Sequence, residues 1–117
     1  MNEEFPLKLG AVSMSINRVS FKHLLGWLIV GTKGGVTRAR IIKTLKETPQ
    51  NANQLATLLQ LDYKAIRHHL GVLQKHRIIT SAGDRYGTTY FLSQAMEENY
   101  ALFEEIGREI WEKEKKE

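Results

Sequence analysis

The sequence predicts a single, mainly α-helical domain with a two-stranded β hairpin, within a chain of 117 residues. Apolar residues recur at helical spacing through residues 21–77. Short β-branched and aromatic runs, separated by turn residues, follow in residues 78–92. A last helical pattern fills residues 94–117, where apolar residues recur at spacings of three and four among Glu and Lys residues.

Residues 51–77 predict two short helices joined by a tight turn. In the second helix Ile66, Leu70 and Leu73 share one face, because they are spaced i, i+4 and i+7. At about 100° per residue, the opposite face carries these polar or small residues: Lys64, Arg67, His68, Gly71 and Lys75. One face is therefore suited to a core and the other to the DNA major groove.

Two further helices are predicted before this pair. Residues 21–30 are apolar on two sides, which indicates a helix that is deeply buried or pressed against another subunit. Residues 38–47 carry an apolar face and a basic face, and Pro49 is expected to end the helix. The predicted N-caps of the helices are Ser20, Thr37, Asn51 and Asp62.

After Arg77 the helical spacing of apolar residues ends, and β-branched or aromatic runs follow. They predict strands at residues 78–80 and 88–92. Ser81–Gly87 contains the glycines and aspartate of a hairpin loop, with Arg85 and Tyr86 at its tip. A ribbon directly after a helix with a basic outer face is a wing. The predicted fold class is therefore a winged helix-turn-helix.

Charge is unevenly distributed along the chain. Residues 21–93 hold 11 Lys or Arg against three acids, whereas residues 94–117 hold four against eight. This asymmetry favours a polyanionic partner for the central part, although a set of solvated surfaces would show the same pattern.

Several classes of function are excluded or disfavoured. The chain has no cysteine, so disulfides, thiolate metal sites and cysteine nucleophiles are excluded. No catalytic constellation is recognisable, the glycines of residues 31–35 do not follow the phosphate-loop order, and no cofactor is expected. The longest apolar run, residues 24–30, is too short to cross a membrane, and no leader segment opens the chain. We therefore expect a cytoplasmic protein that is not an enzyme.

The chain resembles the ArsR-like winged-helix transcriptional regulators, especially archaeal ones, over about residues 37–93. The residues that carry the resemblance are Gln54-Leu55-Ala56, Tyr63 to Leu70, Val72-Leu73 and Ile78-Ile79. It implies a sequence-specific regulator that binds double-stranded DNA as a homodimer through its terminal helices. Metal-sensing relatives use a cysteine pair or Asp and His ligands on the terminal helix. This chain has no cysteine and no histidine in residues 94–117, so no metal site is expected.

These features assign an expected role to each segment. Residues 1–20 are expected to be an N-terminal arm, either a short strand or disordered. Residues 21–93 are the expected DNA-binding domain, with a recognition helix at 63–77 and a wing at 81–87. Residues 94–117 are expected to be a dimerisation helix. A protein-interaction module, or an architectural nucleic-acid-binding protein without sequence-specific regulation, is the alternative. The sequence identifies no small-molecule effector.

Individual residues are assigned on the same basis. The predicted base contacts are Tyr63, Lys64, Arg67 and His68. Arg67 is the strongest of them, because a guanidinium can donate to guanine O6 and N7 together. His69 is expected to be a half-buried structural residue. The predicted contacts to the DNA backbone are Lys43, Asn51, Asn53, Gln54, Lys75 and Arg77, with Arg85 and Tyr86 in the wing. The predicted dimer contacts are Trp27, Met96, Tyr100, Phe103, Ile110 and Trp111.

Overall fold

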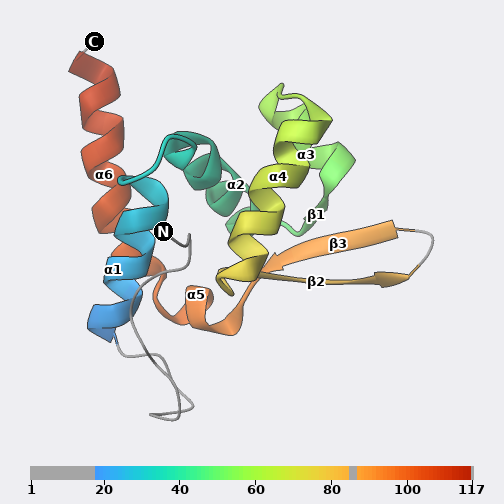
Figure 1. Ribbon diagram of the computed structural model, residues 1–117, viewed down its shortest axis with the longest axis horizontal. Coiled ribbons are helices and arrows are strands. Elements are labelled where there is room, and N and C mark those ends of the chain that lie inside the picture. Colours follow the sequence, from blue (N-terminus) through green and yellow to red (C-terminus); the bar gives the residue numbers. More distant parts are fainter. Residues whose placement is uncertain (1–17, 85–86, 117) are drawn as a thin grey trace, which may run out of the picture.

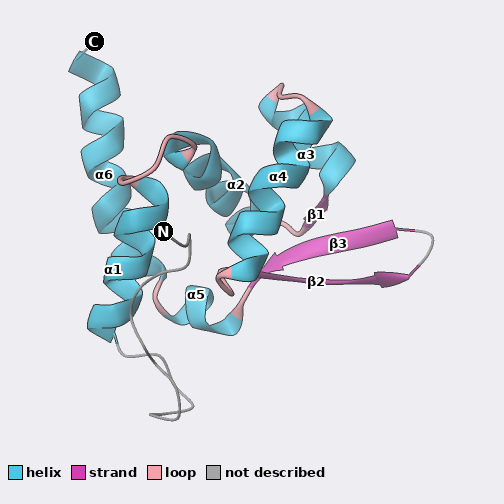
Figure 2. Cartoon of the chain, in the orientation of Figure 1, coloured by secondary structure: helices cyan, strands magenta, loops and turns pink. Residues whose placement is uncertain are grey.

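The computed structural model describes residues 18–84 and 87–116, with the side chains of 18, 109–111 and 113–116 left out. The elements, in order, are α1 (Arg18–Ile29), α2 (Gly35–Glu47), β1 (Gln50–Asn51), α3 (Ala52–Leu59), α4 (Tyr63–Lys75), β2 (Ile79–Asp84), β3 (Gly87–Leu92), α5 (Gln94–Glu98) and α6 (Tyr100–Lys116). The helices form one body, and the β2–β3 hairpin projects from it on the side away from α1 and α6 (Figures 1 and 2). No described helix is long and apolar enough to cross a membrane.

Helix α2 lies at the centre of the domain and contacts α1, α3, α4 and β3. It begins at Gly35 and not after Thr37, so the predicted Thr37 cap is wrong. Gly35 allows this early start because a Cβ there would lie 1.7 Å from the carbonyl oxygen of Ile29. The Ser20 cap is also wrong, since α1 already begins at Arg18.

The two helices of residues 51–77 are confirmed, and both predicted caps are present. The Asn51 side chain accepts a hydrogen bond from the Gln54 amide at 2.7 Å, and the Gln54 side chain accepts one from the Asn51 amide at 2.8 Å. Asp62 accepts a hydrogen bond from the Ala65 amide at 3.2 Å. These caps satisfy amides that have no partner within the first turn of a helix, and so fix where α3 and α4 begin.

The sheet has three strands in the order β1-β3-β2, so the prediction of two strands was incomplete. Strand β1 is only two residues long and pairs Gln50 with Tyr90 and Asn51 with Thr89. Two residues are too few for an alternating pattern, so only the long-range pairing defines this strand. The hairpin loop was predicted too long, because β2 continues through Asp84 and β3 begins at Gly87.

The C-terminal segment is two helices, which corrects the prediction of one. The break lies at Asn99, whose side chain donates to the Ala95 carbonyl oxygen at 2.9 Å. Helix α6 lies beside α1 (Figure 1), and Lys22 of α1 forms a 3.4 Å ion pair with Glu105 of α6. Met96 and Phe103 are 0% and 2% exposed within this one chain. They therefore belong to the protomer's own core and are not available as the predicted dimer contacts.

Gly35→Ala and Gly71→Ala should change the free energy of unfolding in opposite directions. The first should lower it by about 3 kcal/mol, because the new Cβ collides with the backbone of α1. The second should raise it by about 1 kcal/mol, because nothing lies within 4 Å of its Cβ position and alanine favours a helix. Urea unfolding followed by circular dichroism measures both. A Gly35→Ala protein as stable as the wild type would contradict the close approach of α1 and α2.

Candidate nucleic-acid interface

Helix α4 buries one face and exposes the other, as its sequence predicts. Ile66, Leu70 and Leu73 are at most 1% exposed. The four side chains predicted to contact bases all lie exposed: Tyr63, Lys64, Arg67 and His68. The exposed face is cationic, and its residues Tyr63 and Arg67 line one hollow together with residues 51–53 at the start of α3.

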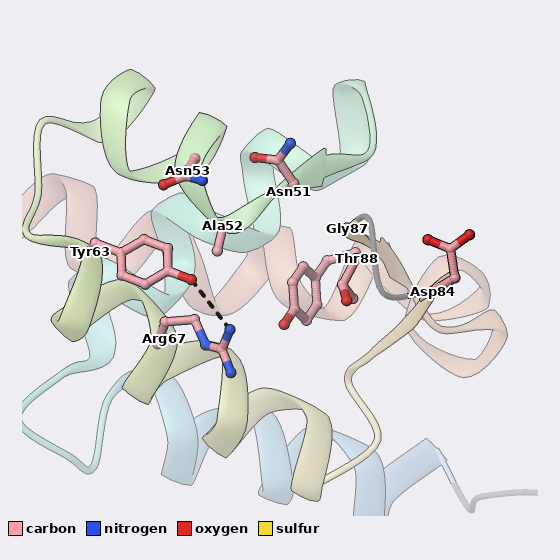
Figure 3. A pocket seen from close by; sticks show the side chains of 9 residues that line it. Asn51, Ala52, Asn53, Tyr63, Arg67, Asp84, Gly87 and Thr88 are labelled. Carbon is pink, nitrogen blue, oxygen red and sulfur yellow. Dashed lines mark hydrogen bonds between the residues drawn. The ribbon is translucent and has the colours of Figure 1, made fainter.

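Arg67 and Tyr63 act as a pair on this face. Arg67 Nη1 lies 3.3 Å from the Tyr63 hydroxyl oxygen, to which it donates, and the guanidinium carbon lies 6.0 Å from the centre of the Tyr63 ring (Figure 3). The hydrogen bond to Tyr63 is the main cause that raises the pKa of Arg67 above its ordinary value. Among the described residues no carboxylate lies within ion-pair distance of Arg67. Its charge is therefore held in place without being neutralised.

A polar hollow of about 310 Å³ lies between the first turns of α3 and α4 and the hairpin. We call it the α4–β3 hollow. Its lining residues are Asn51, Ala52, Asn53, Tyr63, Arg67, Asp84, Gly87, Thr88 and Tyr90. Figure 3 shows that Tyr63 and Arg67 approach the hollow from one side and Thr88 and Asp84 from the other, with Asn51 and Asn53 above. Thr88 and Tyr90 were not predicted from the sequence, because only the register of β3 brings them next to α4.

A buried cation connects α4 to the other helices. Arg38 is 4% exposed and donates from Nε to the Leu28 carbonyl oxygen at 3.1 Å and from Nη2 to the Thr32 hydroxyl. Its Nη1 lies 3.0 Å from His69 Nδ1. Because a guanidinium only donates, Nδ1 of His69 must be the unprotonated nitrogen. This contact confirms the structural role expected of His69 and adds Arg38, which the sequence analysis had not singled out.

The pKa values of this pair follow from the same geometry. Burial lowers the pKa of Arg38. Burial is also the main cause that lowers the pKa of His69, and the charges of Arg38 and His68 lower it further. A proton on His69 would place a second cation against Arg38 and would remove the acceptor that Arg38 uses.

The side chains predicted to contact the DNA backbone are spread over several places. Asn51 and Gln54 are engaged in the cap of α3, and Asn53 lines the α4–β3 hollow. Lys75 and Arg77 lie exposed at the end of α4. Lys43 lines a separate hollow together with residues of α6, so it does not lie with the others. Arg85 and Tyr86 fall outside the described residues.

A second hollow, about 470 Å³ and mainly apolar, runs between α1 and α6. We call it the α1–α6 groove, lined by Lys22, His23, Gly26, Trp27, Val30, Gly31 and Ile106. Val30, directly after α1, is one of these lining residues and is 47% exposed, and Val19, within α1, is 62% exposed. Tyr100 is half-buried against Phe103, whereas the side chains of Ile110 and Trp111 are not among those that the structure describes.

In the described part of the chain no three metal-binding side chains come together.

Residues 35–81 match the model of a family described as bacterial regulatory protein, arsR family. Residues 35–81 are therefore similar to the helix-turn-helix domain of that family. The match begins at the first residue of α2 and ends within β2, so it includes the whole of α3 and α4. A comparison with curated proteins finds no match.

Solved structures resemble these residues and the elements around them. A probable transcriptional regulator from Pseudomonas aeruginosa is 25% identical, with 79% of this chain and 75% of that chain covered at a TM-score of 0.55. The transcriptional regulator HlyU from Vibrio vulnificus is 21% identical, with 78% and 90% covered and a TM-score of 0.59. The homodimeric winged helix-turn-helix DNA-binding domain Mb0332 from Mycobacterium bovis is 16% identical, with 86% and 84% covered and a TM-score of 0.57. These likenesses confirm the winged-helix fold.

His69 should make the stability of the protein depend on pH. Its pKa in the folded chain lies below the ordinary 6.5, so the unfolded chain binds the proton more readily. The stabilising contribution is complete above about pH 6.5 and is lost as the pH falls through the lower, folded value. We expect the urea midpoint to drop between about pH 7.5 and pH 5.5.

His69→Gln should remove most of this pH dependence, because the glutamine oxygen can accept the Arg38 hydrogen bond without titrating. His23→Gln, which changes an exposed histidine of α1, is the matched control and should keep the wild-type dependence. If His69→Gln kept the full pH dependence, the described contact between Arg38 and His69 would not be responsible for it.

Proposed function

We propose that this protein is a transcriptional regulator that binds specific double-stranded DNA sequences as a homodimer. The observation that carries the proposal is the exposed cationic face of α4, within the segment that matches the arsR-family model. The similar structures are described as a probable transcriptional regulator and as a homodimeric DNA-binding domain, which supports the same function here. We further propose a cytoplasmic regulator of the archaeal subgroup, without enzymatic activity.

In this proposal α4 enters the major groove with Tyr63, Lys64, Arg67 and His68 toward the DNA. An α-helix fits this groove, where every base pair presents a distinct pattern of donors and acceptors. The hairpin then follows the backbone or the neighbouring minor groove, with Arg85 and Tyr86 at its tip. Asn53, Lys75 and Arg77 are proposed to contact phosphates, which would add affinity without sequence preference.

The proposed dimer forms through the α1–α6 groove and the exposed side of α6. Val19 of α1 and Val30, directly after α1, are large apolar side chains that remain exposed, and Val30 and Trp27 both line the groove. The proposal also gives Tyr100, Ile110 and Trp111 a place in this interface. Two copies of α4 would then lie about one helical turn of DNA apart, on an operator with two-fold symmetry.

Lys64→Ala and Lys75→Ala should affect DNA binding in different ways. A selection from random duplexes should give a palindromic site for the wild type. Lys64→Ala should relax the preference at one base pair of each half-site, at a cost of about 1–3 kcal/mol. Lys75→Ala should weaken binding to all duplexes equally and reduce the dependence of the binding constant on salt concentration. Fluorescence anisotropy at several salt concentrations measures both.

Two outcomes of the binding experiment would contradict the proposal. If the wild type binds no duplex even at low salt, the protein is a protein-interaction module. If it binds every duplex equally, it is an architectural protein. Both are the alternatives that the sequence had left open.

Val30→Glu should convert the dimer to a monomer, because it places a charge in the proposed apolar interface without touching the protomer's core. Sedimentation equilibrium measures the change. Val36→Glu is the matched control, since Val36 is an exposed valine of α2, 37% exposed, outside the groove lining. A Val30→Glu protein that still sediments as a dimer would remove the α1–α6 groove from the interface.

A further inference from the structure

We infer that the α4–β3 hollow binds one phosphodiester group of the DNA backbone, through the guanidinium of Arg67 and the hydroxyl of Tyr90. The inference rests on the proposed function and assigns a ligand to one part of the same interface. It changes the expected role of Arg67 from a base contact to a backbone contact. It also adds Tyr90, for which no role was predicted from the sequence.

Tyr90 is the unusual member of the hollow. Its side chain is 6% exposed and belongs to the hydrophobic core. Its hydroxyl forms no hydrogen bond with any residue in the described parts of the chain. Among the described residues, every fully buried side-chain oxygen or nitrogen has a hydrogen-bond partner. Because the Tyr90 hydroxyl has none, it cannot be fully buried and must reach the surface of the hollow that Tyr90 lines. A tyrosine with a buried ring usually finds a partner for its hydroxyl, and here a ligand would provide it.

Arg67 supplies the charge for an anionic ligand. One of its five N–H groups is used by the neutral Tyr63 hydroxyl, which leaves four donors and the full positive charge. Because Tyr63 precedes it by four residues, this hydrogen bond holds the guanidinium over the first turn of α4, at the wall of the hollow. Tyr63 is therefore a positioning residue for Arg67.

The position of the hollow favours the backbone over a base. It lies between α4 and the hairpin, which are proposed to enter neighbouring grooves of the DNA. The sugar-phosphate strand that separates two grooves must then pass between these two elements. A base edge, in contrast, lies at the floor of the groove that α4 enters.

The rest of the lining is suited to a phosphate at one end only. Thr88 adds a hydroxyl from β3, and Ala52 and Asn53 begin α3, where backbone amides without helical partners favour an anion. Asp84 also lines the hollow and would repel a phosphate close to it. Arg67 lies on the opposite side of the hollow from Asp84 (Figure 3), and Tyr90 interacts electrostatically with Arg67. The phosphate is therefore assigned to Arg67 and Tyr90, away from the Asp84 carboxylate.

Tyr90→Phe and Arg67→Ala test the assignment on the duplex obtained by selection and on a random duplex. Tyr90→Phe keeps the buried ring and should weaken both duplexes by the same factor, about 10-fold, as expected for a hydrogen bond to a charged group. Arg67→Ala should also weaken both equally, about 10-fold or more, and lower the salt slope by about 1. Asp84→Asn should strengthen both. Thr44→Val, which removes a side-chain hydroxyl on α2 outside the hollow, is the matched control and should change neither.

Neutral methylphosphonate linkages identify the phosphate directly. They are placed one at a time along a half-site. At one position the neutral linkage should weaken binding of the wild type by a clearly larger factor than it weakens binding of Arg67→Ala, which keeps only the Tyr90 contact. This comparison does not depend on the Tyr90→Phe protein being folded, which thermal unfolding checks separately.

Each contrary outcome separates this inference from the proposed function. If Arg67→Ala relaxes the preference at one base pair and leaves the random duplex and the salt slope unchanged, Arg67 contacts a base and the inference is wrong, while the regulator proposal stands. The inference is also wrong if no single linkage behaves as described. A wild type that binds no duplex would overturn the proposed function itself.

Discussion

The burial of one face of α4 determines which residues the protein can offer to a partner. Ile66, Leu70 and Leu73 are fully buried, and burying each aliphatic side chain contributes about 1.5–3 kcal/mol. An exposed ion pair contributes at most about 1 kcal/mol, so no surface interaction of the cations can rotate the helix against this core. Lys64 and Arg67 are exposed because the apolar face of α4, on the opposite side of the helix, must be buried in the core.

The Arg38 contact adds a second constraint on the same helix. Core packing fixes the rotation of α4, whereas hydrogen bonds fix its position relative to the turn between α1 and α2. Arg38 joins the Leu28 carbonyl oxygen and the Thr32 hydroxyl, at the end of α1, to His69 on α4. A buried cation that lost one of these partners would be costly, because its desolvation would no longer be compensated. The helices proposed to bind DNA and to form the dimer are therefore connected through one side chain.

Local signals in the sequence predicted more than non-local ones. The caps at Asn51 and Asp62 and the apolar period of α4 depend on residues close in sequence, and both were predicted. Strand β1 depends on pairing with Tyr90 across 40 residues and was missed. Arg38 shares a helical face with Ile42 and Leu45, which was the available signal for its burial. In the candidate site, the exposed residues of α4 were predicted, but a tyrosine in a strand gives no indication that its hydroxyl will open into a hollow.

The pairing of β1 with β3 gives the base of the hairpin and its tip different freedom to change during evolution. Asn51 caps α3 with its side chain and also pairs with Thr89 through β1. A shift of β3 by one residue would turn Tyr90 out of the core and would disturb the start of α3 at the same time. Insertions near residues 85–86 require neither change. Homologous chains should therefore differ in hairpin length at the tip while they keep the register at its base.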